Sequence, residues 1–346
     1  MGLGGLALAF RYSCVMIPEH LTPLAEALKL GYGIDVAELI ELAGGKDALA
    51  KTFKASAVAG EQYFVKFRVG MDPGISLCAA LHDLGIHSVL APIKTMGGKL
   101  AHFLKDRAVL VYPYKEGHNG FERPLELEHW QQIGEALRKI HDSRLPGDVL
   151  ANLGRERFEV DGVEEFEATK ARLMSGSLQS PAEEALVETI RANAGYIEHV
   201  VRRTPELGLA CQEREWELVP CHADLHVGNV LIDEAGNVNL IDWDAPRLAP
   251  RECDLLFFCD GGILEAHGAS EEANFFSGYG AFEPNPTAMT YYSYARVLED
   301  FVADAREATN LNATPEERME AVELFQALFR SKRSRGYLTG DESRCP

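Results

Sequence analysis

"HADLHVGNVLIDEAGNVNLIDWD", residues 222–244, sets four aspartates and two histidines around short apolar runs. The runs "NVLID" and "VNLID" flank the turn "DEAGN", and this pattern predicts a short β-hairpin. Asp242 then lies at the end of the second strand, while Asp224 and Asn229 lie on the loop that leads into the first strand. We therefore expect these three polar side chains to converge at one end of the hairpin.

Such a convergence suits the transfer of a phosphoryl group from a nucleotide. Mg²⁺ prefers oxygen ligands, which the carboxylate of Asp242 and the amide oxygen of Asn229 would supply. The carboxylate of Asp224, kept off the metal, could orient an acceptor hydroxyl and take its proton. A cation must also hold the phosphates, and Lys66 in the strand-like run "YFVKF" is the candidate. A lysine on a strand is most often simply solvated, so the phosphate-binding role of Lys66 is supported only in combination with the downstream motif.

The pattern along the chain predicts an α+β fold with two lobes. The first lobe reads as an antiparallel β-rich domain, because apolar and polar residues alternate with period two. Its expected elements are strands at 36–43, 48–58 and 61–70, a helix at 74–84, and strands near 88–94, 99–105 and 107–112. From residue 125 onward apolar residues recur at three- and four-residue spacings, which predicts a larger, mostly helical lobe. A capping box that starts at Thr314 predicts a late helix at 314–330.

These elements give a domain scheme with a hinge between the two lobes, and a ligand is expected in the cleft between them. The scheme has a poorly ordered extension at 1–15, a nucleotide-binding lobe at 16–112, a hinge at 113–116, a helical lobe at 117–330 with the catalytic and substrate sites, and a loose tail at 331–346.

Length and charge narrow the class of partner. The chain has 346 residues, of which 46% are hydrophobic and 25% charged, as expected of a globular enzyme. Its formal net charge of −19 argues against a nucleic acid as partner, because a polyphosphate backbone requires a basic surface. The same charge suits a small cationic substrate, although a solvated acidic surface has the same composition.

Cysteine usage and the N-terminus predict a cytoplasmic protein without a membrane anchor. The seven cysteines are scattered and form no C-x-x-C pair, which indicates reduced thiols. Cys221 precedes the motif directly, but a buried structural thiol is a more common role there than a nucleophile. The apolar stretch within residues 1–15 is far shorter than the ~20 residues that span a bilayer.

The motif resembles that of the aminoglycoside phosphotransferase family, which shares the protein-kinase-like fold with choline and homoserine kinases. The signature H-x-D-x-x-x-x-N occurs as His222, Asp224 and Asn229, and "IDWD" follows where protein kinases have D-F-G. The segments "GYGID", "HADLHVGNVLI" and "IDWDAPRLAPRECDLLF" are similar to the spectinomycin phosphotransferase branch of this family. The resemblance extends from about residue 20 to 330. It implies ATP-dependent phosphorylation of a spectinomycin hydroxyl, and hence antibiotic resistance.

The resemblance also implies a role for each matching residue. Asp224 would be the catalytic base, Asn229 and Asp242 would be the Mg²⁺ ligands, and Lys66 would hold the phosphates of ATP. Two further matches are structural: His222 would brace the loop, and Asp254 would cap a helix and tie the loop down. The others would bind the nucleotide, with Gly44 and Gly45 in the turn that covers the phosphates and Tyr112 and Tyr114 in the hinge that reads adenine.

One feature departs from the family pattern. The strand lysine normally pairs with a carboxylate on the following helix, but the segment "MDPGISLCAALHDLG" contains no glutamate. Asp72 or Asp83 could replace it, or the pair could be missing, which leaves the positioning of Lys66 open.

Other functions remain possible at this stage. His222, Asp224 and His226 alternate as in some metal hydrolases, although asparagine at 229 is a poor zinc ligand. The missing glutamate would also suit a pseudokinase that only binds its ligand. Within the kinases, choline or homoserine could be the acceptor, and the oligomeric state cannot be read from one chain.

Recognition of an amine-bearing acceptor would require carboxylates or aromatic rings in the helical lobe. The carboxylate candidates are the segment 158–168, Asp244, Glu252, Asp260 and Glu265, and the aromatic candidates are Tyr279, Tyr291, Tyr292 and Tyr294. For the tyrosines, packing in the core is the more common role.

Overall fold

The computed structural model describes residues 17–42, 49–71, 74–259 and 267–330. The chain divides into two compact units, Met1–Gly117 and His118–Pro346, and each is described here by itself. The expected extension at 1–15 and the loose tail at 331–346 lie outside the described residues.

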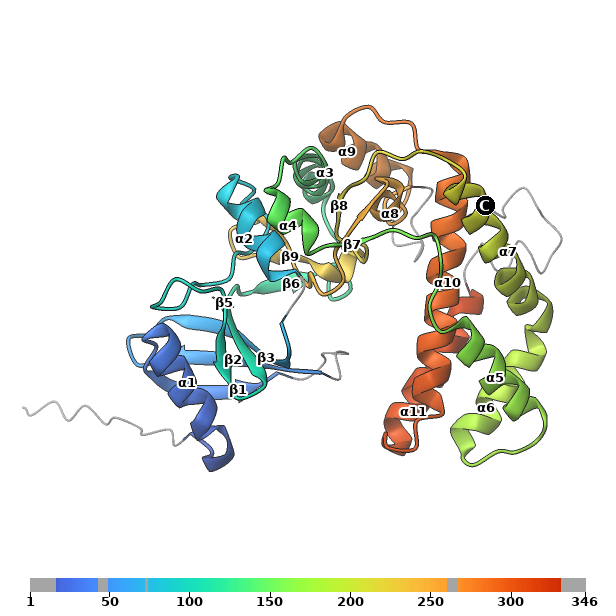
Figure 1. Cartoon of the computed structure of the whole chain (residues 1–346), viewed down its shortest axis with the longest axis horizontal. Helices are drawn as coiled ribbons and strands as arrows, with labels where there is room; N and C mark the ends of the chain where they lie inside the picture. The colour runs from blue at the N-terminus through green and yellow to red at the C-terminus, as the bar shows by residue number, and fades with distance from the viewer. Residues whose placement is uncertain (1–16, 43–48, 72–73, 260–266, 331–346) are drawn as a thin grey trace, which may run out of the picture. The chain divides into compact units, whose positions relative to one another are not determined.

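A five-stranded antiparallel sheet with the order β1-β2-β3-β5-β4 forms the first unit (Figure 1). This arrangement agrees with the predicted β-rich lobe. Its elements are the short 3-10 helix Glu19–Leu21, α1 (Thr22–Tyr32), β1 (Val36–Glu41), β2 (Ala50–Ala57), β3 (Gln62–Val69), α2 (Ile75–Asp83), β4 (His102–Leu104) and β5 (Arg107–Pro113).

The two faces of this sheet are buried by different segments. Leu24 and Leu28 of α1 share a core with Val65 of β3, and α1 crosses this face of the sheet in Figure 1. Ile75 of α2 belongs to a second core that includes Leu110 of β5. Because Lys66 pairs with Leu110 across the antiparallel ladder, both residues lie on this second face. The side chain of Lys66 is buried, at 8% exposure, and is not the solvated lysine that is typical of a strand.

The expected strand near 88–94 is wrong. This segment contains only an isolated bridge position, and the amide of Ile93 donates to the carbonyl oxygen of Val111 at 2.7 Å. Pro92 has no N–H to contribute to a ladder, which explains why an apolar run with strand-like composition does not extend further.

Helices dominate the second unit, as the sequence predicted. They are α3 (Leu127–His141), α4 (Gly147–Ala151), α5 (Val163–Met174), α6 (Pro181–Ala192), α7 (Ala194–Gln212), α8 (Glu252–Leu255), α9 (Ala269–Tyr279), α10 (Pro286–Ala308) and α11 (Pro315–Ala327), with short 3-10 helices at Val227–Asn229 and Leu328–Arg330. Helices α6 and α7 follow each other directly and meet at Asn193.

The long helix α10 is the centre of the helical packing in the second unit and contacts α5, α7, α8 and α11 (Figure 1). Asn285 caps its N-terminus by accepting hydrogen bonds from two backbone amides, and Pro286 follows at the first position. The capping box of Thr314 and Glu317 at the start of α11 is confirmed. Tyr279, Tyr291, Tyr292 and Tyr294 are all buried and therefore belong to the core.

Two small three-stranded sheets complete this unit and carry the polar motif. The predicted hairpin is confirmed, because β9 (Val230–Asp233) pairs antiparallel with β10 (Val238–Leu240), and β6 (Gly117–Asn119) borders β9. In the other sheet β11 (Arg247–Ala249) lies between β7 (Gly154–Arg155) and β8 (Val219–Cys221).

Within the described ranges, none of the helices combines the length and apolar character that crossing a membrane requires.

Candidate active site

The loop between β8 and β9 is held by the ring of His222. The Nδ1 atom of His222 accepts from the amide of Asp224 at 3.3 Å, and Nε2 lies 2.9 Å from the carbonyl oxygen of Ile241. Both bonds are satisfied when the proton is on Nε2. His222 is 1% exposed and its ring packs 4.5 Å from that of Trp243. One side chain therefore joins the loop to the segment after β10.

Asp254 holds the backbone of the same loop with both oxygens of its carboxylate. Its two oxygens accept from the backbone amides of Ala223 at 2.7 Å and His222 at 2.9 Å, and Oδ2 also lies 3.1 Å from Nε2 of His141. Burial alone would raise the pKa of Asp254, but its hydrogen bonds with His141 and Ala223 and its electrostatic interactions with the His141 and His222 rings lower the pKa below its usual value. The bonds of Asp254 go to the loop and to His141, and not to a helix terminus as the family pattern suggested.

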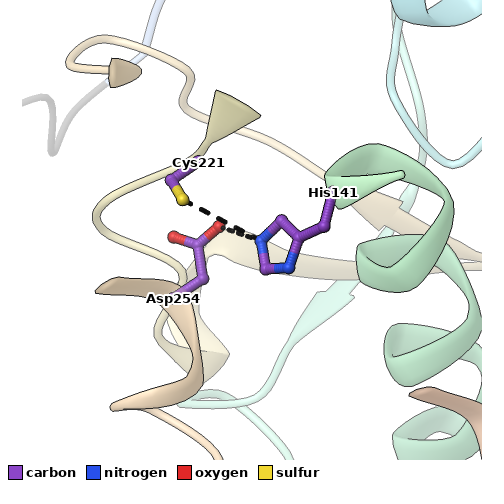
Figure 2. A group of neighbouring side chains, drawn as sticks. All are labelled: His141, Cys221 and Asp254. Carbon is purple, nitrogen blue, oxygen red and sulfur yellow. Dashed lines mark hydrogen bonds and ion pairs between the residues drawn. The ribbon is translucent and has the colours of Figure 1, made fainter. Parts of the chain in front are cut away.

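His141, Cys221 and Asp254 bring three ligand atoms within 4.8 Å of one another, the one such group among the described residues (Figure 2). The hydrogen bonds account for this group without an ion. Nδ1 of His141 lies 2.8 Å from the hydroxyl of Tyr279, and the Asp254 oxygens are already acceptors. Burial raises the pKa of the Cys221 thiol well above its usual value, so it is a poor metal ligand and a poor nucleophile.

The backbone of Asp224 is fixed at both of its polar groups. Its amide donates to His222, and its carbonyl oxygen accepts from Nδ2 of Asn229 at 2.8 Å and from the amide of His226 at 3.0 Å. Its side chain is 38% exposed and pairs with Arg296, whose Nη1 lies 2.6 Å from Oδ1. The loop thus presents one partly exposed carboxylate on a rigid backbone.

Asn229 is oriented by the same contacts. Because its Nδ2 donates to the carbonyl oxygen of Asp224, the amide oxygen of the 7% exposed side chain is turned away from that carbonyl. The amide of Ile241 donates to the carbonyl oxygen of Asn229 at 3.0 Å, which places Asn229 beside the residue that precedes Asp242. The hairpin therefore brings Asn229 and the exposed Asp242 to the same end, as the sequence predicted.

Two residues of the site adopt a backbone conformation that non-glycine residues rarely take. The φ angle is +69° at Ala223 and +67° at Asp242. Such strain costs of order 1 kcal/mol or more and persists only where the surroundings enforce it. Here the enforcing contacts are the bonds of Asp254 to the loop and the packing of Trp243 on His222.

The hydrolase alternative fails on the same geometry. Both ring nitrogens of His222 are used by the backbone, and Nδ1 of His226 accepts from the amide of Gly228 at 3.1 Å. Nε2 of His226 lies 3.9 Å from Asp224, but His222 has no ring nitrogen left for an ion, and the one group of potential metal ligands among the described residues contains none of these three.

Gly120 supports the loop through a close backbone approach. Its amide donates to the carbonyl oxygen of Val227 at 2.9 Å, and a Cβ at position 120 would lie 2.6 Å from the Val227 Cβ and 2.8 Å from that oxygen. Only glycine fits at this distance.

We expect Gly120→Ala to displace Val227 and the adjacent Asn229. The expected results are a loss of about 1–3 kcal/mol from overpacking and a lower catalytic rate. The measurements are the melting temperature and kcat of the variant. Gly147→Ala is the matched control, because a Cβ there meets no atom within 4 Å. If Gly120→Ala had the melting temperature and kcat of the wild type, the loop would accommodate the added methyl group without loss of stability or activity.

The first unit holds the nucleotide candidates that the structure describes. Tyr112 lies on β5, with its ring 6.3 Å from that of Phe64. The amide of Tyr114 donates to the carbonyl oxygen of Gln62 at 3.2 Å. The amide is therefore already used, and the carbonyl oxygen is the backbone group of Tyr114 that could accept a hydrogen bond from an adenine base. Lys66 is buried in the middle of β3. Gly44, Gly45 and Asp72 lie outside the described residues.

Sequence reasoning missed Arg296, the ion-pair partner of Asp224. The two residues are 72 positions apart, and nothing in the pattern of α10 distinguishes this arginine from others on helix faces. Of the carboxylates suggested for amine binding, Glu252 is buried and accepts from the amide of Asn285 at 2.7 Å, which is a structural role. Asp260 and Glu265 lie outside the described residues.

The antiparallel sheet of the first unit and the mostly helical second unit match the fold of the kinase-like phosphotransferases. Residues 47–292 match the family described as "Phosphotransferase enzyme family", also called APH, and the chain belongs to this family. The protein is an enzyme of the small-molecule kinase and phosphotransferase class.

Two of the similar solved structures are complexes of one enzyme. The chain is similar to the spectinomycin phosphotransferase APH(9)-Ia in complex with ADP and spectinomycin, with 28% identity over 88% of this chain and 93% of that one and a TM-score of 0.79. The AMP-bound complex of the same enzyme matches with a TM-score of 0.78, at 27% identity over 90% of this chain and 95% of that one.

More distant relatives show the fold alone or a partial match. An aminoglycoside phosphotransferase from Alicyclobacillus acidocaldarius is 15% identical over 98% of this chain and 99% of that one, with a TM-score of 0.57. Protein StrN of Streptomyces griseus is 24% identical over 178 residues, which are 50% of this chain and 55% of StrN. The chain thus matches about half the length of this curated relative.

Proposed function

We propose that this protein transfers the γ-phosphate of ATP to a hydroxyl of a small cationic antibiotic, with spectinomycin as the acceptor and its 9-hydroxyl as the target. This reaction would give resistance by O-phosphorylation. The observation that carries the proposal is the likeness to a spectinomycin phosphotransferase over 88% of this chain at 28% identity. The nucleotides named in the two complexes of that enzyme support ATP as the donor.

Asp224 is proposed as the catalytic base. As the acceptor oxygen bonds to the γ-phosphorus, its O–H bond breaks and the proton passes to the Asp224 carboxylate. The bond between the γ-phosphorus and the bridging oxygen breaks at the same centre, and that oxygen leaves with ADP. The partly exposed carboxylate on a backbone fixed by His222 and Asn229 suits this role.

Residues of the first unit are proposed to bind the nucleotide. Lys66 on β3 would hold the α- and β-phosphates, and the segment from Tyr112 to Tyr114 would read the adenine edge. The burial of Lys66, at 8% exposure, supports the assignment, because a lysine without a specific role normally stays at the surface.

The donor set at the end of the hairpin fits Mg²⁺. The amide oxygen of Asn229 is oriented by the bond of its own NH₂ group, and Asp242 adds a carboxylate, so the ligands are the hard oxygens that this ion prefers. When bound, Mg²⁺ would neutralise charge on the phosphates. The strained backbone of Asp242, with φ of +67°, is consistent with a side chain whose direction is set by function.

The decisive experiment is a panel of acceptors with the full chain. Spectinomycin, several aminoglycosides, choline and homoserine are each incubated with ATP or GTP and Mg²⁺, and products are identified by mass spectrometry and NMR. We expect a singly phosphorylated spectinomycin. Phosphorylation of choline or homoserine alone would replace the proposed acceptor, while a melting shift with nucleotide but no product would indicate a binding protein.

Asp242→Ala is expected to weaken binding of Mg²⁺-ATP, because one of the two proposed protein ligands is lost. We expect the Mg²⁺-dependent rise in melting temperature with ATP to shrink or vanish. In EDTA, which removes Mg²⁺, ATP should change the melting temperature of the variant and of the wild type by the same amount. Unchanged affinity for Mg²⁺-ATP in the variant would contradict the metal assignment.

A further inference from the structure

Arg296 on α10 contacts the proposed catalytic base directly. Its Nη1 donates to Oδ1 of Asp224 at 2.6 Å, and the two side chains are 26% and 38% exposed. A bond between two charged groups at this distance is about twice as strong as a neutral one, and partial burial protects it from solvent screening.

The guanidinium group is itself fixed in place. Asp300, one helical turn further along α10, accepts from Nε of Arg296 at 3.4 Å and lies 3.3 Å from Nη2. Burial would lower the pKa of Arg296, but the carboxylates of Asp300, Asp224 and Glu299 raise it above its usual value. Arg296 is thus a permanent cation between carboxylates on the helix and the carboxylate on the loop.

This contact distinguishes the two oxygens of Asp224. Oδ1 is engaged by Arg296, whereas the one charged or ionisable side chain recorded near Oδ2 among the described residues is that of His226, with Nε2 at 3.9 Å. That distance exceeds the range of a hydrogen bond, so Oδ2 is the oxygen that an acceptor hydroxyl could reach. The loop contacts fix the backbone of Asp224, and Arg296 fixes the rotation of its carboxylate.

We infer that Arg296 is a positioning residue for phosphoryl transfer, which holds Oδ1 of Asp224 so that Oδ2 faces the acceptor hydroxyl. This inference rests on the proposed function, because it takes Asp224 as the base. The acceptor proton would then pass to Oδ2, and Arg296 would remain charged and would exchange no proton.

Carboxylates around Arg296 offset its positive charge, so that a cationic acceptor can bind nearby. Glu299 and Asp300 accompany Arg296 on α10, and a second arginine, Arg247, lies 3.7 Å from the carboxylate of Glu156 nearby. With Asp224, four carboxylates face two guanidinium groups; burial raises the pKa of Glu299, but even without its charge three carboxylates outnumber the two arginines, so the local charge is negative. An ammonium group on the acceptor would therefore be attracted and not repelled.

The test is Arg296→Ala in the full chain, assayed with ATP and the best acceptor of the panel. We expect kcat to fall about 100-fold, as is typical when a catalytic group is misplaced by about 1 Å, with KM for both substrates changed by less than about threefold. Added guanidinium ion should restore part of kcat, and Arg296→Lys should lose less than Arg296→Ala. A purely structural role predicts neither the rescue nor the split between kcat and KM.

Arg306→Ala is the matched control on the same helix. Arg306 pairs with Glu165 at 2.6 Å, is 55% exposed and makes no contact with the loop. We expect wild-type kcat for this variant and no effect of guanidinium. If Arg296→Ala does not fold, as judged by its melting curve, Arg296→Gln and Arg296→Lys provide the same comparison.

Two results separate failure of this inference from failure of the proposed function. Wild-type kcat in Arg296→Ala or Arg296→Gln, or a loss that neither lysine nor guanidinium relieves, would overturn the inference alone. If the wild type phosphorylates no acceptor of the panel, the proposed function fails. Hydrolysis of ATP with water as acceptor then replaces the transfer assay, and an equal hydrolysis rate in Arg296→Ala overturns the inference as well.

Discussion

Replacement of Asp224 by asparagine is expected to lower kcat by about 10²–10⁴-fold, the usual contribution of a general base. The amide has nearly the same shape as the carboxylate but cannot take the acceptor's proton. The backbone contacts of Asp224 with His222 and Asn229 do not involve its side chain, so the loop should keep its conformation.

Binding of ATP should be largely retained in Asp224→Asn, because the proposed base acts on the acceptor. Steady-state kinetics gives kcat, and the rise in melting temperature with Mg²⁺-ATP gives nucleotide binding. Asp161→Asn is the control, since Asp161 is 90% exposed and pairs only with Arg157. An Asp224→Asn enzyme with near-wild-type kcat would refute the assigned role.

Asp254→Ala should have the largest effect on stability. It removes the acceptor of the amides of His222 and Ala223 and of the His141 ring, all in a fully buried place. Loss of one partner from such a buried charged network typically costs about 3–5 kcal/mol. For a unit of this size we expect a fall in melting temperature of roughly 10 °C, together with loss of activity as the loop loosens.

Asp254→Asn should lie between Asp254→Ala and the wild type, because its amide oxygen can still accept one of the hydrogen bonds. The order of the three melting temperatures tests the hydrogen-bond account. If Asp254→Asn and Asp254→Ala melted at the wild-type temperature, the anchor would contribute nothing to stability.

The same residue predicts a dependence on pH. The pKa of Asp254 in the folded protein is below its usual value of about 3.9, so its carboxylate stabilises the fold fully above that value. This contribution is lost as the pH falls through the folded-state pKa. We therefore expect the stability difference between wild type and Asp254→Ala to narrow below about pH 4, and chemical denaturation at several pH values measures it.

The sequence alone determined the fold class and the hairpin, and it placed Asn229 and Asp242 at the same end of that hairpin. These features depend on local signals: period-two alternation, the turn "DEAGN", and the spacing of Asp224, Asn229 and Asp242 along a single short segment. Residues so close in sequence are brought together by the hairpin itself, whatever the rest of the chain does. The strand expected near 88–94 failed because that expectation followed the apolar run and gave too little weight to Pro92, which has no N–H for a ladder.

Only the tertiary structure decided which partners surround the constellation. Arg296 reaches Asp224 from 72 residues away, and His141 reaches Asp254 from 113 residues away, through the packing of helices whose sequences carry no mark of these contacts. The partner of a charged side chain depends on which distant helices and strands pack beside it. A local sequence pattern contains no information about that packing. Sequence thus identified the groups that suit the chemistry, and tertiary packing determined how they are oriented and held.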